Sequence, residues 1–171
     1  MSATAVMSFA QFEHLPEAPG KRELIGGEVF QVLPRKYRRT RIAKRLYDLL
    51  SGSAFGDRVL QEAGYRIGGG WLQPDVSVTQ PNQPLESDYL MGAPSLAIEI
   101  LSPCNTAAEI ERKLTLYFAE GADEVWVIAP AHRSLSAYRR VESQVQRFSV
   151  RSSYDAVSFG VVVSLDVLFA E

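Results

Sequence analysis

The chain has 171 residues, of which 46% are hydrophobic and 22% charged, the length and composition of one folded domain. Its single cysteine, Cys104, excludes an intrachain disulfide and a structural zinc site built on cysteines. There is neither an apolar run of the roughly 18 residues that a membrane helix needs nor a signal-peptide pattern. We therefore expect a single cytoplasmic domain over residues 1–171 with no membrane partner.

Short strands and one long helix are predicted over the first 80 residues. Apolar residues recur at helical spacing in one segment, at Ile42, Leu46, Leu49 and Leu50. Gly26-Gly27 is typical of a two-residue hairpin, and the glycines 68–70 are expected to form a flexible connection. In chain order, the expected elements are a helix over 9–15 capped by Ser8, strands over 22–25 and 28–33, a helix over 37–51, and strands over 58–61, 64–67 and 75–79.

The second half of the chain is predicted to supply the buried strands. The strand over 96–101 is nearly all apolar, as is typical of a strand buried on both faces, and the strand over 123–129 resembles it. Because a single helix separates them, we expect the two to run parallel in a layered α/β (α+β) domain. The other expected elements are a loop or broken helical turn over 81–94, a helix over 105–120 capped by Asn105 and ended by Gly121, a hairpin of 134–141 and 144–150, and a strand over 159–165.

Positive charge is concentrated in one segment. The formal net charge is −2, from 18 Lys and Arg against 20 Asp and Glu. Seven of these cations lie within eleven residues that contain no acid: Arg35, Lys36, Arg38, Arg39, Arg41, Lys44 and Arg45. The rest of the chain then has 11 cations against 20 acids, a balance of −9. A basic element on an acidic protein is typical of a surface that binds a polyanion, and a solvated helix face has the same pattern.

Glu99 is an ionisable residue in an otherwise apolar strand. A buried carboxylate without a partner is costly, so Glu99 requires a proton, a cation or a metal ion. Asp75 opens the strand after Pro74, and alternation places its side chain on the same face as Ser77 and Thr79. If the two strands are neighbours, the two carboxylates converge, and a divalent cation would relieve their repulsion.

Lys113 lies at the margin of the apolar face of the helix over 105–120. Its stem can pack against that face while its ammonium reaches the ends of the strands. Two interpretations stay open at this point. Lys113 completes the site of Asp75 and Glu99, or it forms an ordinary i,i+4 surface pair with Glu109.

Four short motifs follow one another along the chain. They are Arg22-Glu23-Leu24-Ile25-Gly26-Gly27-Glu28, Pro74-Asp75-Val76, Ala97-Ile98-Glu99-Ile100-Leu101-Ser102-Pro103 and Lys113-Leu114-Thr115-Leu116-Tyr117. Together they resemble the Uma2 family, also called DUF820, of the PD-(D/E)xK restriction-endonuclease-like superfamily. The resemblance implies a restriction-endonuclease-like core over about 20–140, with a mixed sheet flanked by helices, an N-terminal helix and hairpin, and a C-terminal β-hairpin.

The resemblance also implies roles for the charged residues of these motifs. Asp75 and Glu99, with the backbone carbonyl of Ile100, correspond to ligands of Mg²⁺ or Mn²⁺, and Mg²⁺ in proteins takes oxygen donors and retains water. Lys113 corresponds to the lysine that orients the attacking water or stabilises the phosphate in the transition state. Glu23 corresponds to an acidic residue that completes such sites.

Leu101 occupies the position where the superfamily usually has its lysine. The resemblance to Uma2 therefore implies that Lys113, on the next helix, has the role of that lysine. The implied activity is metal-dependent hydrolysis of phosphodiester bonds in DNA, with the cations of 35–45 on the phosphate backbone. The alternative is a nuclease fold that binds nucleic acid, or serves in assembly, without catalysis. The apolar C-terminal hairpin makes a homodimer a further expectation.

Overall fold

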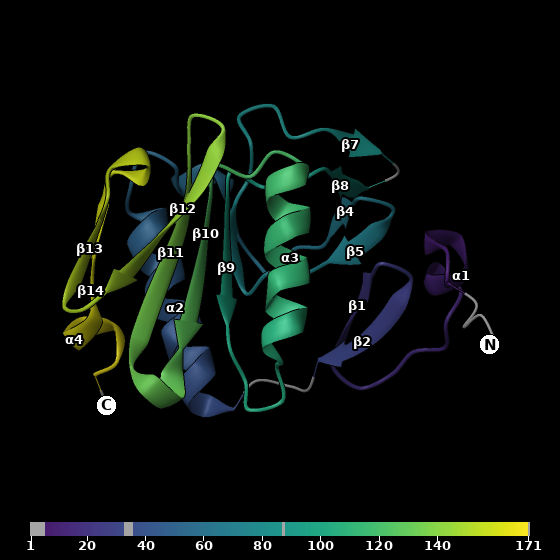
Figure 1. Ribbon diagram of the computed structural model, residues 1–171, viewed down its shortest axis with the longest axis horizontal. Helices are drawn as coiled ribbons and strands as arrows, with labels where there is room; N and C mark the ends of the chain where they lie inside the picture. The colour runs from purple at the N-terminus through teal and green to yellow at the C-terminus, as the bar shows by residue number, and fades with distance from the viewer. Residues whose placement is uncertain (1–5, 33–35, 87, 171) are drawn as a thin grey trace.

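The computed structural model describes residues 6–32, 36–86 and 88–170, and a six-stranded sheet, here called the central sheet, lies in its middle (Figure 1). Its strand order is β12-β11-β10-β9-β6-β3. These strands are β3 (Val59–Gln61), β6 (Val76–Val78), β9 (Leu96–Ile100), β10 (Glu124–Ala129), β11 (Ser134–Val141) and β12 (Gln144–Val150). β9 and β10 are parallel, as predicted, and the other neighbours are antiparallel. The mixed sheet expected from the sequence is therefore present.

A second sheet, here called the side sheet, has the order β2-β1-β5-β4-β8-β7. Its strands are β1 (Lys21–Ile25), β2 (Glu28–Val32), β4 (Tyr65–Ile67), β5 (Gly70–Leu72), β7 (Leu85–Glu86) and β8 (Tyr89–Met91). Gly26 and Gly27 have φ of 58° and 81°, the left-handed values that the turn between β1 and β2 requires. A third, two-stranded sheet pairs β13 (Ser153–Ala156) with β14 (Val161–Ser164).

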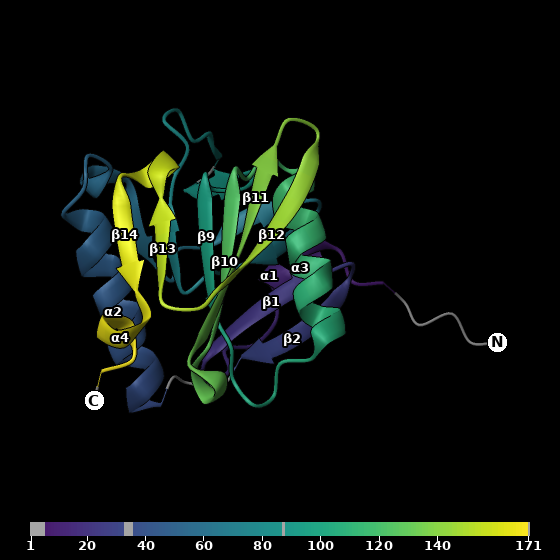
Figure 2. The ribbon, with the colours of Figure 1, turned by 60° about the vertical axis from the view of Figure 1, so that its left-hand side comes forward.

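The two long helices cover opposite faces of the central sheet (Figures 1 and 2). These are α2 (Tyr37–Ser51), with the predicted bounds, and α3 (Ala107–Ala119). The shorter helices are α1 (Phe9–Glu13), capped by Ser8 as predicted, and α4 (Leu165–Leu168), with the 3-10 turns η1 (Gly56–Arg58), η2 (Pro130–His132) and η3 (Val157–Phe159). None of the helices described here is both long and apolar enough to cross a bilayer.

Alternation along the central strands divides the interior into two cores. Ile98 and Trp126 face α2 and the hairpin of β13 and β14, where they pack against residues such as Leu46. Ala97 and Val125 point the other way and pack beneath α3 and the side sheet. Because α3 lies between the two sheets, a side chain on its inner face can contact both.

Two expectations about the helices were wrong. Asn105 does not cap α3, because the Thr106 hydroxyl accepts the hydrogen bond from the Glu109 N–H at 3.1 Å. Leu49 is 36% exposed, and Ala43, which lies on the buried side of α2, takes its expected place in the core.

The glycine stretch and the proline-rich loop both contain strands. Gly68 and Gly69 form the turn between β4 and β5, and β7 and β8 lie within 81–94. These strands have two or three residues each, too few for alternation to be recognised in the sequence.

Candidate active site

Asp75 and Glu99 lie on adjacent strand segments of the central sheet. Val76 pairs with Ile98 in the antiparallel register of β6 and β9, so the preceding Asp75 lies opposite Glu99. Asp75 Oδ2 also accepts a hydrogen bond from the Ile100 N–H at 2.6 Å, which ties the aspartate to the strand of Glu99. Both carboxylates are buried, and alternation assigns both to the face that α3 covers.

The Lys113 ammonium bridges two carboxylates that belong to different sheets. Its Nζ lies 3.0 Å from Glu99 Oε2 in the central sheet and 2.6 Å from Glu23 Oε2 in the side sheet. Lys113 is 3% exposed and Glu23 0%. Glu109 instead accepts a hydrogen bond from Asn105 Nδ2 at 2.8 Å, so the structure places Lys113 with the buried acids and not in a surface pair.

Tyr117, one helical turn after Lys113, supplies a second partner for Glu99. Its hydroxyl donates to Glu99 Oε1 at 2.8 Å. Burial, with a further contribution from the charge of Glu99, raises the pKa of Tyr117 well above its usual value, so the hydroxyl remains a donor. Sequence reasoning missed this residue. The available signal was its i,i+4 spacing from Lys113, combined with the need of a buried tyrosine hydroxyl for a partner.

Burial and mutual charge together set the protonation of this cluster. Burial raises the pKa of Glu99, the charge of Lys113 opposes that shift, and the charge of Glu23 adds to it. For Lys113, burial disfavours the charged form, but the negative charges of Glu99 and Glu23 outweigh burial and raise its pKa above the ordinary value. Lys113 is therefore an ammonium at neutral pH and acts as a charge and a hydrogen-bond donor, not as a base.

Two cations face Asp75 from separate elements. Lys21 Nζ lies 3.6 Å from Asp75 Oδ1, and a terminal nitrogen of Arg39 lies 3.7 Å from Oδ2. Their side chains are only 12% and 11% exposed. Lys21 was missed in the sequence, although it lies two residues before Glu23 and so shares a face of β1 with it. Arg39 belongs to the basic segment and is turned toward the buried acid.

Gln73 links this arrangement through its backbone. Its N–H donates to Glu23 Oε1 at 3.0 Å, and its carbonyl accepts a hydrogen bond from the Lys21 ammonium. The residue lies two positions before Asp75, so the connection from β5 to β6 holds both acids in place. The site is a continuous network across β1, this connection, β9 and α3.

The donor atoms at this site fit a hard divalent cation. Carboxylate and carbonyl oxygens are the ligands that Mg²⁺ and Mn²⁺ prefer, and Asp75, Glu99 and Ile100 offer them from adjacent strands. Within the described part of the chain, no three His, Cys, Asp or Glu side chains are grouped closely enough to hold a metal by themselves. A metal ion here would need water and substrate oxygens to complete its shell, which is usual for Mg²⁺.

Most of the basic segment, from Arg38 to Arg45, lies in the first half of α2, on the other face of the central sheet from Lys113. Its exposed members are Lys36, Arg38 and Lys44, and its half-buried members are Arg39, Arg41 and Arg45. Arg35 lies outside the described residues. The cations of this segment therefore divide between a surface and the acidic site, and Arg39 belongs to the latter.

Comparison with known proteins identifies the fold and the family. A crystal structure described as "a putative nuclease belonging to DUF820", from Anabaena variabilis ATCC 29413, shares the fold with a TM-score of 0.81 and 22% sequence identity, over 96% of this chain and 98% of that one. No match is found among curated proteins. The model of the Uma2 family, described as "Putative restriction endonuclease", matches residues 9–167, a span that includes Glu23, Asp75, Glu99 and Lys113. The chain belongs to the Uma2 family.

Proposed function

We propose that this protein is a metal-dependent endonuclease that hydrolyses phosphodiester bonds in DNA. The observation that carries the proposal is that Lys113 joins the buried carboxylates of Glu23 and Glu99, with buried Asp75 on the strand beside Glu99, in a chain of the Uma2 family. A fold that needed only stability could replace such a cluster with apolar side chains of similar volume at little cost. Buried ionisable groups whose pKa is shifted by burial and by neighbouring charges are instead typical of catalytic sites.

In this proposal, Asp75, Glu99 and the Ile100 carbonyl hold Mg²⁺ or Mn²⁺. The bound ion would lower the pKa of a water molecule and offset the charge that develops on the scissile phosphate. Lys113 has three N–H donors, one of which it donates to Glu99, and its ammonium also forms an ion pair with Glu23. Its remaining donor capacity can orient a water or a phosphate oxygen.

Lys21 and Arg39 have a supporting role in this proposal. Their distances to Asp75, 3.6 and 3.7 Å, are longer than hydrogen bonds, so each cation acts on the carboxylate through its charge. With a metal ion held by Asp75, both cations would be placed to attract the phosphate that is cleaved. The exposed cations of α2 would contact the flanking phosphate backbone.

The proposal is tested by incubating purified protein with supercoiled plasmid and with single-stranded DNA, in Mg²⁺, in Mn²⁺ and in EDTA. We expect metal-dependent nicking that falls at least 100-fold in D75N, E99Q and K113M, since each removes a ligand or a charge at the reacting phosphate. D155N and E111Q remove exposed carboxylates outside the site and are the matched controls. Circular dichroism establishes that each variant is folded. Absence of cleavage in both metals, or cleavage unchanged in D75N and E99Q, would overturn the proposal.

A second candidate is a nucleic-acid-binding or assembly domain without turnover. It is favoured by the charge balance of the site, where Lys113, Lys21 and Arg39 already face the three acids. Titration calorimetry with Mn²⁺ separates the two functions. A site that binds a metal ion gives a saturable heat that E99Q abolishes, whereas acids paired only with internal cations give none.

A further inference from the structure

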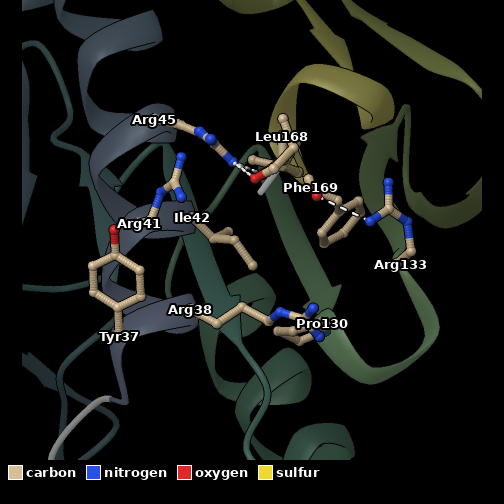
Figure 3. A pocket seen from close by; sticks show the side chains of 10 residues that line it. Tyr37, Arg38, Arg41, Ile42, Arg45, Pro130, Arg133, Leu168 and Phe169 are labelled. Carbon is tan, nitrogen blue, oxygen red and sulfur yellow. Dashed lines mark hydrogen bonds between the residues drawn. The ribbon is translucent and has the colours of Figure 1, made fainter.

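A basic cavity lies between the start of α2, the η2 turn and α4 (Figure 3). Its volume is about 210 Å³, and ten of the described residues line it. Four of them are arginines, namely Arg38, Arg41, Arg45 and Arg133, and no Asp or Glu is among the described lining residues. Ile42, Leu168 and Phe169 contribute apolar surface. The cavity combines concentrated positive charge with an apolar wall.

Two of these arginines donate hydrogen bonds to uncharged backbone carbonyls of the described residues. Arg45 donates to the backbone carbonyls of Leu168 and Ala170 at 3.0 and 2.6 Å. Arg133 donates to the carbonyl of Phe169 at 2.9 Å, and both sets of bonds converge on the end of α4 (Figure 3). Carbonyls orient a guanidinium but carry no net charge, and each guanidinium has five N–H donors. The two arginines are thus held in place with donors to spare.

The start of α2 adds to the positive potential. Lys36 precedes the helix without a side-chain capping bond, and the first turn contains no acid. Arg38 and Arg39 therefore lie at the positive end of the helix dipole. An anion bound at this end of the helix would interact favourably with the dipole and accept hydrogen bonds from nearby arginines.

The cavity and the acidic site lie at the same end of the central sheet. The parallel strands β9 and β10 end at Ile100 and Ala129, and η2, which leads to Arg133, follows directly. The first turn of α2 serves both places, since Arg38 lines the cavity and Arg39 faces Asp75. A strand lying over this end of the sheet could therefore contact both.

We propose that this cavity binds a phosphomonoester, presented by the end of a nucleic acid strand that is bound at the acidic site. A phosphomonoester has a charge of about −1.5 to −2 at neutral pH and continues in one direction only. An internal phosphodiester has a single charge and continues in both directions, so it fits an open surface better than a cavity. The volume of about 210 Å³ equals roughly seven waters of about 30 Å³ each, enough for a phosphate and part of a sugar. That the end of a nucleic acid strand supplies this phosphomonoester rests on the proposed nuclease function.

The experiment measures equilibrium binding of the full-length protein in EDTA, so that no metal-dependent cleavage occurs. The probes are internally labelled ten-nucleotide single strands with a 5′-phosphate, a 3′-phosphate or hydroxyls at both ends, competed with inorganic phosphate and with a deoxynucleoside 5′-monophosphate. We expect one phosphorylated strand to bind about tenfold more tightly than the hydroxyl strand, the ratio expected from one charge-assisted hydrogen bond. R41A and R133A should abolish that ratio. R151A, which removes an exposed arginine outside the cavity, should preserve it.

The outcomes distinguish the cavity from the nuclease activity. Equal affinity for all three strands and no binding of the competitors overturns the proposal, as does an end preference that survives in both R41A and R133A. The free nucleotide could bind in a way that depends on Arg41 and Arg133 while no strand shows an end preference. That result would support a cavity that binds phosphomonoesters and would overturn the proposal that a strand end supplies them. An end preference in a protein that cleaves nothing supports the cavity and counts against the nuclease. R133A loses a hydrogen bond to the Phe169 carbonyl. If that loss prevents folding, R41A still tests the proposal.

Discussion

Replacing Lys113 with methionine tests the electrostatic account of the site. The variant K113M keeps an unbranched stem but leaves Glu23 and Glu99 buried without the cation that they share at 2.6 and 3.0 Å. Removing one partner of a buried ion pair costs about 3–5 kcal/mol. Proton uptake by a buried carboxyl limits this loss, because protonating an ordinary glutamate at pH 7 costs about 1.36 kcal/mol for each pH unit above its usual pKa, or about 3.7 kcal/mol. We expect K113M to lose about 3–4 kcal/mol of unfolding free energy at pH 7.

The loss should shrink as the pH falls. Burial and the charge of Glu23 already raise the pKa of Glu99 against the opposing effect of Lys113, and removing Lys113 raises it further. A carboxyl whose pKa is higher in the folded state takes up a proton on folding. Its contribution to stability is therefore full below the unfolded-state pKa and is lost as the pH rises through the folded-state pKa. Relative to wild type, K113M should regain about 2–3 kcal/mol between pH 7 and pH 5.

Urea unfolding followed by circular dichroism at the two pH values measures both effects. With an m-value of about 2 kcal/mol/M, the midpoint of K113M at pH 7 should fall by about 1.5–2 M. The control K44M removes an exposed ammonium that is paired with Asp48 and should change stability by less than about 0.5 kcal/mol. A loss below about 1 kcal/mol for K113M, or equal losses at pH 7 and pH 5, would refute the role of Lys113 as the shared counter-ion of two buried carboxylates.

Three further predictions concern the surroundings of the site. Y117F removes a hydroxyl that donates to Glu99 and should cost about 1–3 kcal/mol in urea unfolding, and an unchanged midpoint would show that the hydrogen bond contributes nothing. G70A places a Cβ 2.1 Å from a backbone oxygen of β1 and should lower the free energy of unfolding by about 3 kcal/mol. G69A meets open space at φ +76° and should lower it by about 1 kcal/mol. Equal melting temperatures for the two variants would contradict the close approach of β5 to β1. K36A should lower the slope of log binding constant against log salt concentration for duplex DNA by about 0.9, as expected for one phosphate contact, and an unaltered slope would place the duplex elsewhere.

The local elements and the identity of the unusual residues were determined by the sequence. Helical spacing located α2 with its observed bounds, and the alternating and apolar runs located β9, β10 and the hairpin of β11 and β12. These predictions succeed because each depends on periodicity within one continuous segment, which is long enough to show it. Glu99 was recognised for the same reason, as a charge that the burial of its own strand makes costly.

The partners of these residues were decided by the tertiary structure. Periodicity reports which face a side chain lies on, but not which element covers that face, so nothing local could pair Lys113 with Glu23 across two sheets or turn Arg39 toward Asp75. Short strands such as β5 and β7 likewise exist only because neighbouring strands offer them hydrogen bonds. The basic cavity depends on Arg133 meeting α2 and α4, three segments far apart in the chain. Burial and packing between distant segments, which set the charges and contacts at both sites, are properties of the folded molecule.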